Sequence, residues 1–403
     1  MTETTWNPTS TPSPSPDETP AVTEPILGLP ETTWTPPAPS TPPAKHSSKG
    51  VAFALAAGLL IGAAGTGAVL LASDAGDSTN AASSSALQQV TSNPPAVARA
   101  DGSVAAVAAD VLPSVVSIKG TSGQGSGVIL DTEGHILTNN HVAVLGENGG
   151  SLTVVLQDGR SATATVVGLD PATDLAIIKV DGVDGLKPIS LGTSGDLAVG
   201  DQVLAIGSPL GLSGTVTEGI VSALNRPVTA GEASATSSLA VFEAIQTDAA
   251  INPGNSGGAL VDGSGNLIGI NSAIASLGSS SGGPSGSIGL GFAIPIDQAK
   301  RIAQELIDSG TATHARLGTT VGDVQTGTGA TLGDVTDGSA AAQAGLRSGD
   351  VVTKIDGRVI DGSEGLVAAI RSQAPGTDVT LTYLRDGNEA TATVTLGSDE
   401  GTA

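Results

Sequence analysis

The sequence has no cysteine, few histidines and very few aromatic residues. The lack of cysteine excludes disulfides and thiolate-bound metal sites. The four histidines (His46, His135, His141 and His314) are scattered without metal-ligand spacing, so we expect no metal and no cofactor. Because aromatic residues make up only 1% of the chain, the core must consist of Val, Ile, Leu and Ala, which favours β-rich packing.

Basic residues are also scarce. The chain has 16 Lys and Arg against 39 Asp and Glu, a net charge of −23 at pH 7. A nucleic-acid partner requires clusters of Lys and Arg that neutralise phosphates, and we find none, so we expect no nucleic acid as a partner. At 403 residues, the chain is long enough for two or three domains.

The first hundred residues do not have the pattern of a folded domain. Residues 1–50 are rich in Pro, Thr and Ser and are predicted to form a disordered cytoplasmic tail. Residues 51–73 carry no charge and no proline, and are long enough for one transmembrane helix of about 20 residues. Two lysines precede this segment and two aspartates follow it, so the positive-inside rule places the N-terminus in the cytoplasm and the rest outside. The alternative is a cleaved signal peptide, whose apolar region is usually shorter. Residues 74–100 are predicted to be a flexible linker.

From residue 101 the pattern indicates a folded, all-β dominated chain. Residues 101–309 hold a helical pattern that ends at Pro113, about eleven short strand-like runs and a closing helix over 296–307 with Gly310 as its stop. Residues 310–398 form a smaller α+β unit with six strand-like runs and two short helices. The strands predicted in the larger unit are 115–118, 127–130, 135–138, 152–156, 163–169, 175–180, 202–206, 214–224, 259–261, 267–274 and 289–293.

The stretch 246–258 has the pattern of a nucleophile loop. Ser256 follows Gly254 by two residues and precedes Gly257 and Gly258. Such glycines allow a sharp turn that can expose one hydroxyl and direct two backbone N–H groups at one point, as an oxyanion requires. An ordinary Asn-Pro-Gly-Asn turn would have the same residues. A base and an orienting acid elsewhere in the chain would decide between the two.

Two upstream residues fit those roles. His141 is predicted to end a strand beside two asparagines, and Asp174 to stand at the mouth of an apolar strand. Histidine is suited to proton transfer near neutral pH, and a part-buried carboxylate can hold its tautomer. The order His141, Asp174, Ser256 is that of chymotrypsin-like triads.

Three other candidates have structural interpretations. Asp170, before Pro171, is predicted to be a turn residue. His135 is expected on the exposed side of a strand, and His314 in the linker between the two units, both without a partner.

The motifs at 137–142, 170–180, 219–224 and 246–261 resemble the HtrA/Deg family of trypsin-like serine proteases, in its membrane-anchored, actinobacterial form. The resemblance covers residues 101–398 and implies a chymotrypsin-like double β-barrel of two six-stranded barrels. It assigns His141 as general base, Asp174 as its orienting acid and Ser256 as nucleophile. The N–H groups of Gly254 and Ser256 would form the oxyanion hole. Family members are usually trimers, so a homo-trimer is possible.

The resemblance also suggests where substrate binds. The floor of the specificity pocket in chymotrypsin-like enzymes lies six residues before the serine, here at Ala250 with Ile251 beside it. With no carboxylate there, we expect a small aliphatic residue at the cleaved position. Ile270, Asn271 and Ser272 are the expected edge for strand addition by the substrate backbone.

The second unit resembles a PDZ domain through the run from Gly338 to Val352. Its carboxylate-binding loop would be Arg316, Leu317, Gly318 and Thr319, which would bind C-terminal peptides by β-augmentation. The family usually has a bulkier apolar residue where Thr319 stands.

The sequence therefore predicts a single-pass cell-membrane protein whose extracytoplasmic serine endopeptidase cleaves misfolded or regulatory envelope proteins. Two loops, 229–239 and 277–287, are rich in Ser, Gly and Ala, and in the resembling family loops at these places order the oxyanion hole. A regulated, partly inactive resting state follows as an expectation. The alternatives are a non-proteolytic peptide-binding chaperone or scaffold, and a cytoplasmic adaptor that acts through residues 1–44.

Overall fold

The computed structural model describes residues 102–146, 151–209, 214–230, 240–273, 287, 289–324 and 327–399. All of them belong to one compact unit, Pro94–Ala403. The predicted tail, the apolar segment 51–73 and the linker lie outside these residues, as do most of the two glycine- and serine-rich loops. Within the described ranges, no helix has both the length and the apolar character needed to cross a membrane.

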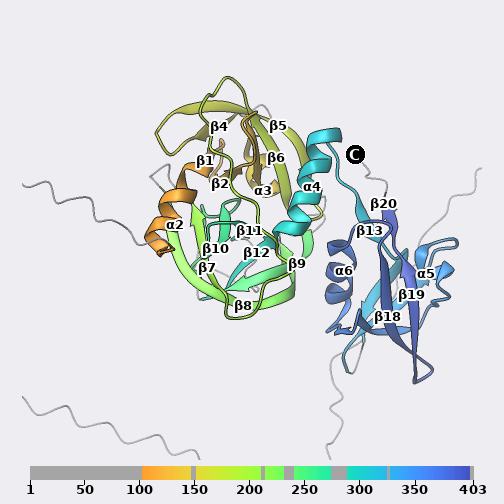
Figure 1. Ribbon diagram of the computed structural model, residues 1–403. Helices are drawn as coiled ribbons and strands as arrows, with labels where there is room; N and C mark the ends of the chain where they lie inside the picture. Colours follow the sequence, from red (N-terminus) through yellow and green to blue (C-terminus); the bar gives the residue numbers. More distant parts are fainter. Residues whose placement is uncertain are drawn as a thin grey trace, which may run out of the picture. The chain divides into compact units, whose positions relative to one another are not determined.

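Twelve strands of the described chain close into two six-stranded barrels (Figure 1). The N-terminal barrel has the order β1-β2-β3-β6-β5-β4, and the C-terminal barrel has the order β10-β11-β12-β9-β8-β7. The strands are β1 Val115–Lys119, β2 Gln124–Ile129, β3 His135–Thr138, β4 Leu152–Val155, β5 Ser161–Asp170, β6 Leu175–Val180, β7 Gln202–Gly207, β8 Thr215–Ala230, β9 Ala240–Thr247, β10 Ala259–Asp262, β11 Leu267–Ser272 and β12 Gly291–Pro295. The prediction of two barrels of six is confirmed.

Aliphatic side chains fill the interior, as the shortage of aromatic residues requires. Ile118, Ile136 and Ile178 are fully buried inside the N-terminal barrel. A larger cluster includes Leu137 from the first barrel and Phe242 from the second, so the barrels share a core. Burial of apolar surface stabilises a fold by about 25 cal/mol per Å². The shared core therefore stabilises the packing of the two barrels that carry the site residues.

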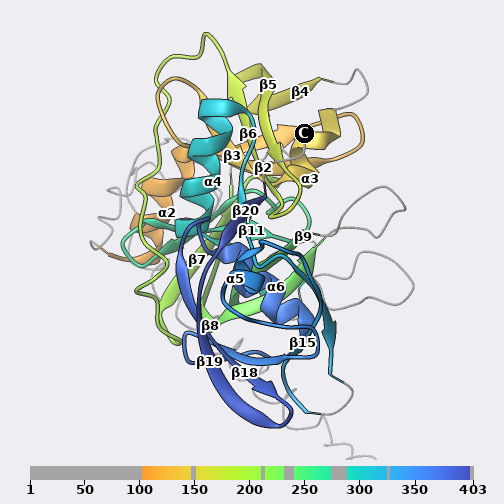
Figure 2. The ribbon, with the colours of Figure 1, turned by 90° about the vertical axis from the view of Figure 1, so that its right-hand side faces the viewer.

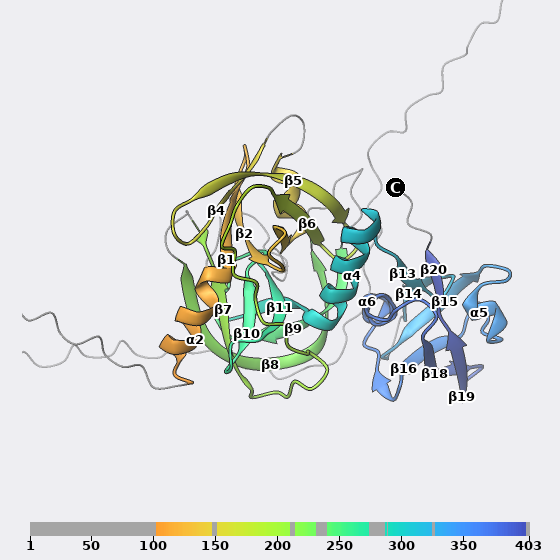
Figure 3. The same cartoon turned by 45° about the horizontal axis from the view of Figure 1, so that its top comes forward.

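Helices cover two sides of the barrels (Figure 3). The helix α2 (Val104–Val111) starts at an N-cap, Ser103, and packs against β7, and the single 3₁₀ turn η1 (Leu112–Ser114) contains the predicted stop. The helix α4 (Ile296–Ser309) contacts β5, β6 and β11 and ends at Gly310, whose φ of 79° is the left-handed conformation that glycine accepts most readily. Both predicted helices are therefore confirmed.

Three local expectations were wrong. The strand β9 was not predicted, and its neighbour β8 continues six residues beyond the predicted end at 224. His141 does not end a strand but lies in α3 (Asn140–Ala143), a single turn followed by the 3₁₀ turn η2 (Val144–Gly146). His135 is buried rather than exposed. Its ring Nδ1 lies 2.6 Å from Asp131 Oδ2 across the turn that precedes β3, so it also has a partner.

The C-terminal part is a small α+β fold with its own core (Figure 2). Its main sheet has the order β14-β15-β16-β18-β19, with β17 beside β16, and β13 pairs with β20. Its elements are β13 His314–Arg316, β14 Thr319–Asp323, β15 Ala330–Val335, α5 Ala340–Gln343, β16 Val351–Ile355, β17 Arg358–Val359, α6 Ser363–Ser372, β18 Asp378–Arg385, β19 Asn388–Thr395 and β20 Gly397–Asp399. Both short helices fall where the sequence predicted them.

Candidate active site

The predicted base and acid meet at the junction of β3, α3 and the β5–β6 turn. His141 Nδ1 lies 3.0 and 2.9 Å from the two carboxylate oxygens of Asp174, and the His141 backbone N–H donates to Asp174 Oδ1 at 3.1 Å. The Asp174 side chain is 7% exposed and that of His141 is 25% exposed. With Nδ1 occupied by the carboxylate, Nε2 is the ring nitrogen available for proton transfer.

The backbone of Asp174 is held in an unusual conformation. Its φ is 58°, in the left-handed region that Asp enters more readily than most residues. The Asp174 carbonyl accepts hydrogen bonds from Asn139 Nδ2 at 2.9 Å and from the Asn140 backbone N–H at 3.1 Å. The two asparagines before His141 therefore position the turn that carries the acid.

Ser256 lies on the loop between β9 and β10, with only 5% of the residue exposed. Its Oγ accepts a hydrogen bond from the Ala273 N–H at 3.1 Å, and Ser272 Oγ lies 3.5 Å from Asp174 Oδ2. Residues Ser272 and Ala273, at the end of β11, therefore connect the nucleophile candidate to the acid. Between the described residues, no hydrogen bond joins Ser256 Oγ to His141, a contact that is often long in the absence of substrate.

The loop around Ser256 needs glycine. Gly257 has a φ of 80°, and a Cβ there would collide with the Ser126 carbonyl and Thr138 Oγ1. Gly254 has a φ of 100°. Between the described residues, no hydrogen bond from the backbone N–H of Gly254 or Ser256 is found, and these are the two donors that the predicted oxyanion hole requires.

The predicted pocket residues lie beside this loop. The Ile251 side chain is buried and lies close to Gly291, and the Ala250 carbonyl accepts a hydrogen bond from Thr217 Oγ1 at 2.9 Å. The nearest carboxylate along the chain, Asp248, instead accepts the Ile220 N–H at 2.8 Å.

The predicted substrate-pairing edge at Ile270, Asn271 and Ser272 is wrong for Ile270 and Asn271, which have backbone partners on both sides. Strand β11 lies inside the closed barrel, where Ile270 pairs with both Ala259 and Ile294 and Ser272 pairs with Phe292. All three residues are buried. Among the described residues, Ser272 has a strand partner on one side only, Phe292 of β12.

The predicted peptide-binding loop lines a groove of about 490 Å³ between β14 and α6. Arg316, Leu317, Gly318 and Thr319 form one end, and the helix contributes Leu366, Val367, Ile370 and Arg371. Burial, followed by repulsion from Arg316, lowers the pKa of the Arg371 guanidinium below its ordinary value. The groove is thus lined by apolar side chains and two arginines, of which Arg316 forms an ion pair with Asp399 at 3.2 Å.

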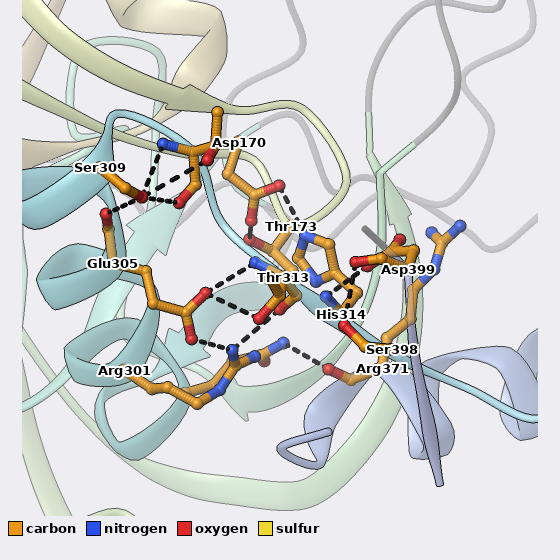
Figure 4. A network of polar contacts seen from close by, with 12 residues as sticks. Asp170, Thr173, Arg301, Glu305, Ser309, Thr313, His314, Arg371, Ser398 and Asp399 are labelled. Carbon is orange, nitrogen blue, oxygen red and sulfur yellow. Dashed lines mark hydrogen bonds and ion pairs between the residues drawn. The ribbon is translucent and has the colours of Figure 1, made fainter. Parts of the chain in front are cut away.

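The prediction that His314 is a linker residue without a partner was wrong. Its Nε2 lies 2.9 Å from Asp170 Oδ1, and both side chains are almost fully buried (Figure 4). Asp170 also accepts the Ala172 N–H at 3.2 Å and the Thr173 hydroxyl, so the predicted Asx-type turn is present as well. This pair connects the turn of Asp174 to β13, which leads into the peptide-binding loop.

Further contacts join the barrels to the C-terminal fold. Helix α6 packs against β8 and β9, and Arg358 forms an ion pair with the buried Glu243 on β9. Gln298 Nε2 donates to the Arg371 carbonyl at 3.2 Å. The helix that walls the peptide groove therefore contacts the strand that leads into the nucleophile loop.

Sequence reasoning missed Ser126, and it did not foresee that Asn139 and Ser272 hold the site together. Each is a small polar residue in a strand or at its end, and each is fully or almost fully buried. A polar residue within an otherwise apolar strand was the available signal. Among the described residues, no group of three or more His, Asp or Glu could hold a metal ion.

Comparison with known families agrees with this division of the chain. Residues 125–270 match the trypsin-like peptidase domain, and residues 315–396 match the PDZ domain. The chain is 54% identical to the serine protease PepD of Mycobacterium tuberculosis, over 76% of this chain and 68% of PepD. It is 39% identical to the periplasmic serine endoprotease DegP of Escherichia coli over 68% of this chain, but spans only 56% of DegP.

Solved structures give the same result. The HtrA-type protease AlgW with a tripeptide matches 74% of this chain and 98% of its own, with a TM-score of 0.55 and 37% identity. AlgW with a decapeptide matches with a TM-score of 0.53 and 33% identity. The chain thus belongs to the HtrA/Deg family of trypsin-like serine endopeptidases with a C-terminal PDZ domain.

Proposed function

We propose that this chain cleaves peptide bonds by an acyl-enzyme mechanism with His141, Asp174 and Ser256 as its triad. The observation that carries the proposal is the contact of both Asp174 carboxylate oxygens with His141 Nδ1, at 2.9 and 3.0 Å. That contact fixes the tautomer in which Nε2 can accept a proton. The connection from Asp174 through Ser272 and Ala273 to Ser256 supports the same assignment.

In the first half of the reaction, Ser256 Oγ attacks the scissile carbonyl carbon while its proton passes to His141 Nε2. The new C–O bond leaves a negative charge on the carbonyl oxygen, which accepts hydrogen bonds from the Gly254 and Ser256 N–H groups. When this intermediate collapses, the C–N bond breaks and the leaving amine takes the proton from Nε2. Asp174 stabilises the imidazolium throughout without itself being protonated.

In the second half, His141 takes a proton from a water molecule, whose oxygen attacks the acyl carbon. The second tetrahedral intermediate collapses with loss of Ser256 Oγ, which recovers its proton from His141 Nε2. The products are a carboxylic acid and the free hydroxyl of Ser256, so atoms and protons balance with no cofactor.

We further propose that the enzyme prefers a small aliphatic residue such as Val or Ala at the cleaved position. Ala250 and the buried Ile251 support an apolar pocket, and Asp248 is occupied by the Ile220 N–H. The backbone at Ser272, which pairs with β12 on one side only, would pair with the substrate strand. Cleavage after Lys or Arg would contradict this preference.

The PDZ groove is proposed to bind the C-termini of peptides. Arg316, Leu317, Gly318 and Thr319 at one end and the α6 residues on the other wall support this role. The contacts of α6 with β8 and β9 give peptide binding a route to the nucleophile loop, in keeping with the regulated resting state expected from the sequence.

The cellular setting is also a proposal. The uncharged segment 51–73, with lysines before it and aspartates after it, supports a single-pass cell-membrane protein with extracytoplasmic protease and PDZ domains. The relative DegP is named as a periplasmic endoprotease. Misfolded or regulatory envelope proteins are then the proposed substrates, and a homo-trimer the proposed assembly.

The test is labelling of the purified protein with a fluorophosphonate, together with mapping of new peptide termini in the proteome. We expect Ser256→Ala to abolish both labelling and cleavage, and Ser264→Ala, at an exposed serine, to retain both. Intact peptide binding without labelling of the wild type would instead support the non-proteolytic scaffold.

A further inference from the structure

One serine of the N-terminal barrel contacts the nucleophile loop of the C-terminal barrel at both ends. The Ser126 N–H, on β2, donates to the Ser256 carbonyl at 2.8 Å, and Ser126 Oγ donates to the Gly254 carbonyl at 2.6 Å. Oγ also accepts the Ser208 N–H at 2.8 Å. Ser126 is fully buried.

The contacts of Ser126 extend back toward the acid and base. Its carbonyl accepts a hydrogen bond from Thr138 Oγ1 at 2.7 Å, one residue before Asn139, whose side chain holds the Asp174 carbonyl. Ser126 therefore lies between the segment that carries His141 and Asp174 and the loop that carries Ser256.

The two carbonyls held by Ser126 are the ends of a three-residue arc. Within this arc, the Ser256 N–H lies between the two held carbonyls. The Gly254 N–H lies just before the arc, separated from the Gly254 carbonyl by the two backbone rotations of that glycine. Gly254 has a φ of 100° and no side chain to restrict it, so its backbone can rotate easily unless something else holds it. The hydroxyl of Ser126 supplies that restraint.

We infer that Ser126 acts through its hydroxyl as a positioning residue for the oxyanion hole, an inference that rests on the proposed function. It touches no reacting atom. By holding the Gly254 carbonyl, it limits rotation of the segment that follows and so keeps the Ser256 N–H directed at the position where negative charge develops. Its removal would leave the buried Gly254 carbonyl and Ser208 N–H without a partner and would allow the loop to rotate.

The chain offers a matched control in Ser117. Ser117 lies directly opposite Ser126 in the β1–β2 pairing and is also fully buried. Its Oγ has no hydrogen-bond partner in the described part of the chain. Ser117→Ala therefore removes the same hydroxyl from the same depth without affecting the nucleophile loop.

The experiment compares Ser126→Ala and Ser117→Ala by steady-state kinetics on a peptide substrate. Loss of one direct oxyanion donor costs about 10²–10³ in kcat, and for this indirect restraint we expect a fall of about 10- to 100-fold, with KM within about twofold. Affinity for a peptide boronate, which forms a tetrahedral adduct on Ser256, should fall in parallel. Substrate binding measured in the Ser256→Ala background should not change, and Ser117→Ala should keep kcat.

Three results would overturn the inference: a normal kcat in Ser126→Ala, an equal loss in Ser117→Ala, or weaker substrate binding in the Ser256→Ala background. Thermal unfolding checks that Ser126→Ala is folded. If it is not, Ser126→Cys retains the shape with a weak S–H donor, and a normal boronate affinity in that folded variant would overturn the inference. A wild type that neither cleaves nor labels would refute the proposed function itself, whereas an active wild type with an unaffected Ser126→Ala would refute this inference alone.

Discussion

Two His–Asp pairs in this molecule have the same chemistry but different surroundings. The pair of His141 and Asp174 belongs to the proposed active site, and the pair of His314 and Asp170 joins the end of β5 to β13 at the start of the PDZ domain. Their aspartates are four residues apart on the same β5–β6 turn, and their closest N···O distances are both 2.9 Å. Distance alone does not distinguish them.

The two pairs differ in the solvent exposure of the histidine and in the surroundings of its second ring nitrogen. The His141 side chain is 25% exposed, so its second nitrogen can meet Ser256 and a substrate, whereas the His314 side chain is 6% exposed. His314 Nδ1 is buried and has no partner among the residues that the structure describes (Figure 4). A carboxylate on a histidine therefore makes a catalytic base only when the other nitrogen faces a reacting group; otherwise the pair is part of an interface.

The largest effect is expected at the catalytic pair. Asp174→Asn removes the charge that selects the tautomer of His141, and kcat should fall by about 10³–10⁴-fold with the fold intact. Steady-state kinetics and the rate of fluorophosphonate labelling measure this change, with Asp170→Asn as the matched control. An equal loss of kcat in Asp170→Asn would mean that both pairs act in catalysis, and the distinction drawn here would fail.

A change of stability rather than activity is expected at the interface pair. Asp170→Asn weakens a buried contact to His314 and should lower the free energy of unfolding by about 1–3 kcal/mol, with little change in kcat. Chemical denaturation of the wild type and both Asn variants gives the comparison. Unchanged stability would show that the His314–Asp170 contact contributes nothing net to the fold.

The ion pair of Arg358 with Glu243 provides a second test of the interface. Breaking a fully buried pair costs about 3–5 kcal/mol, and because Arg358 is one-third exposed we expect Arg358→Ala to cost about 1–3 kcal/mol. Adding Glu243→Gln should recover part of this loss, since the uncompensated buried charge is then gone. If the double variant is no more stable than Arg358→Ala, desolvation of Glu243 is not the cause.

The smallest effect is expected at a third His–Asp pair, Asp131 with His135, which is local to one turn. Partial burial of Asp131 opposes ionisation, but hydrogen bonds from the His135 side chain and backbone and the nearby imidazole outweigh it, so the pKa of Asp131 lies below its usual range. Because the pKa of Asp131 is lower in the folded state than in the unfolded state, its ionisation stabilises the fold. This stabilisation is fully present above the unfolded-state pKa of about 4 and is lost as the pH falls through the folded-state pKa.

Asp131→Asn should therefore be slightly less stable than wild type near pH 6, and the difference should vanish in acid. Thermal unfolding of both proteins from pH 6 down to about pH 3 measures it. A difference that grew toward low pH would contradict the assigned direction of the pKa shift.

The sequence by itself determined the division into two folded units and the candidate residues of the triad, because both depend on local pattern. That the first unit is a pair of barrels and the second a PDZ domain followed from the family resemblance. Strand runs broken by glycine, a helix that ends at Gly310 and the Gly254–Gly258 motif are readable without tertiary contacts. Strand β9 escaped detection because its pattern includes Glu243, whose burial depends on Arg358 far along the chain.

Only the tertiary structure decided that His141 is the most exposed of the three described histidines, with 25% of its side chain exposed against 10% for His135 and 6% for His314. His135, His141 and His314 all lie beside an aspartate. The partner of His135 is close in the sequence, whereas the partners of His141 and His314 are brought to them by the tertiary fold. The same is true of Ser126, whose hydroxyl bonds a carbonyl 128 residues away. A hydrogen bond depends on direction and burial, and these are set when two barrels pack against each other.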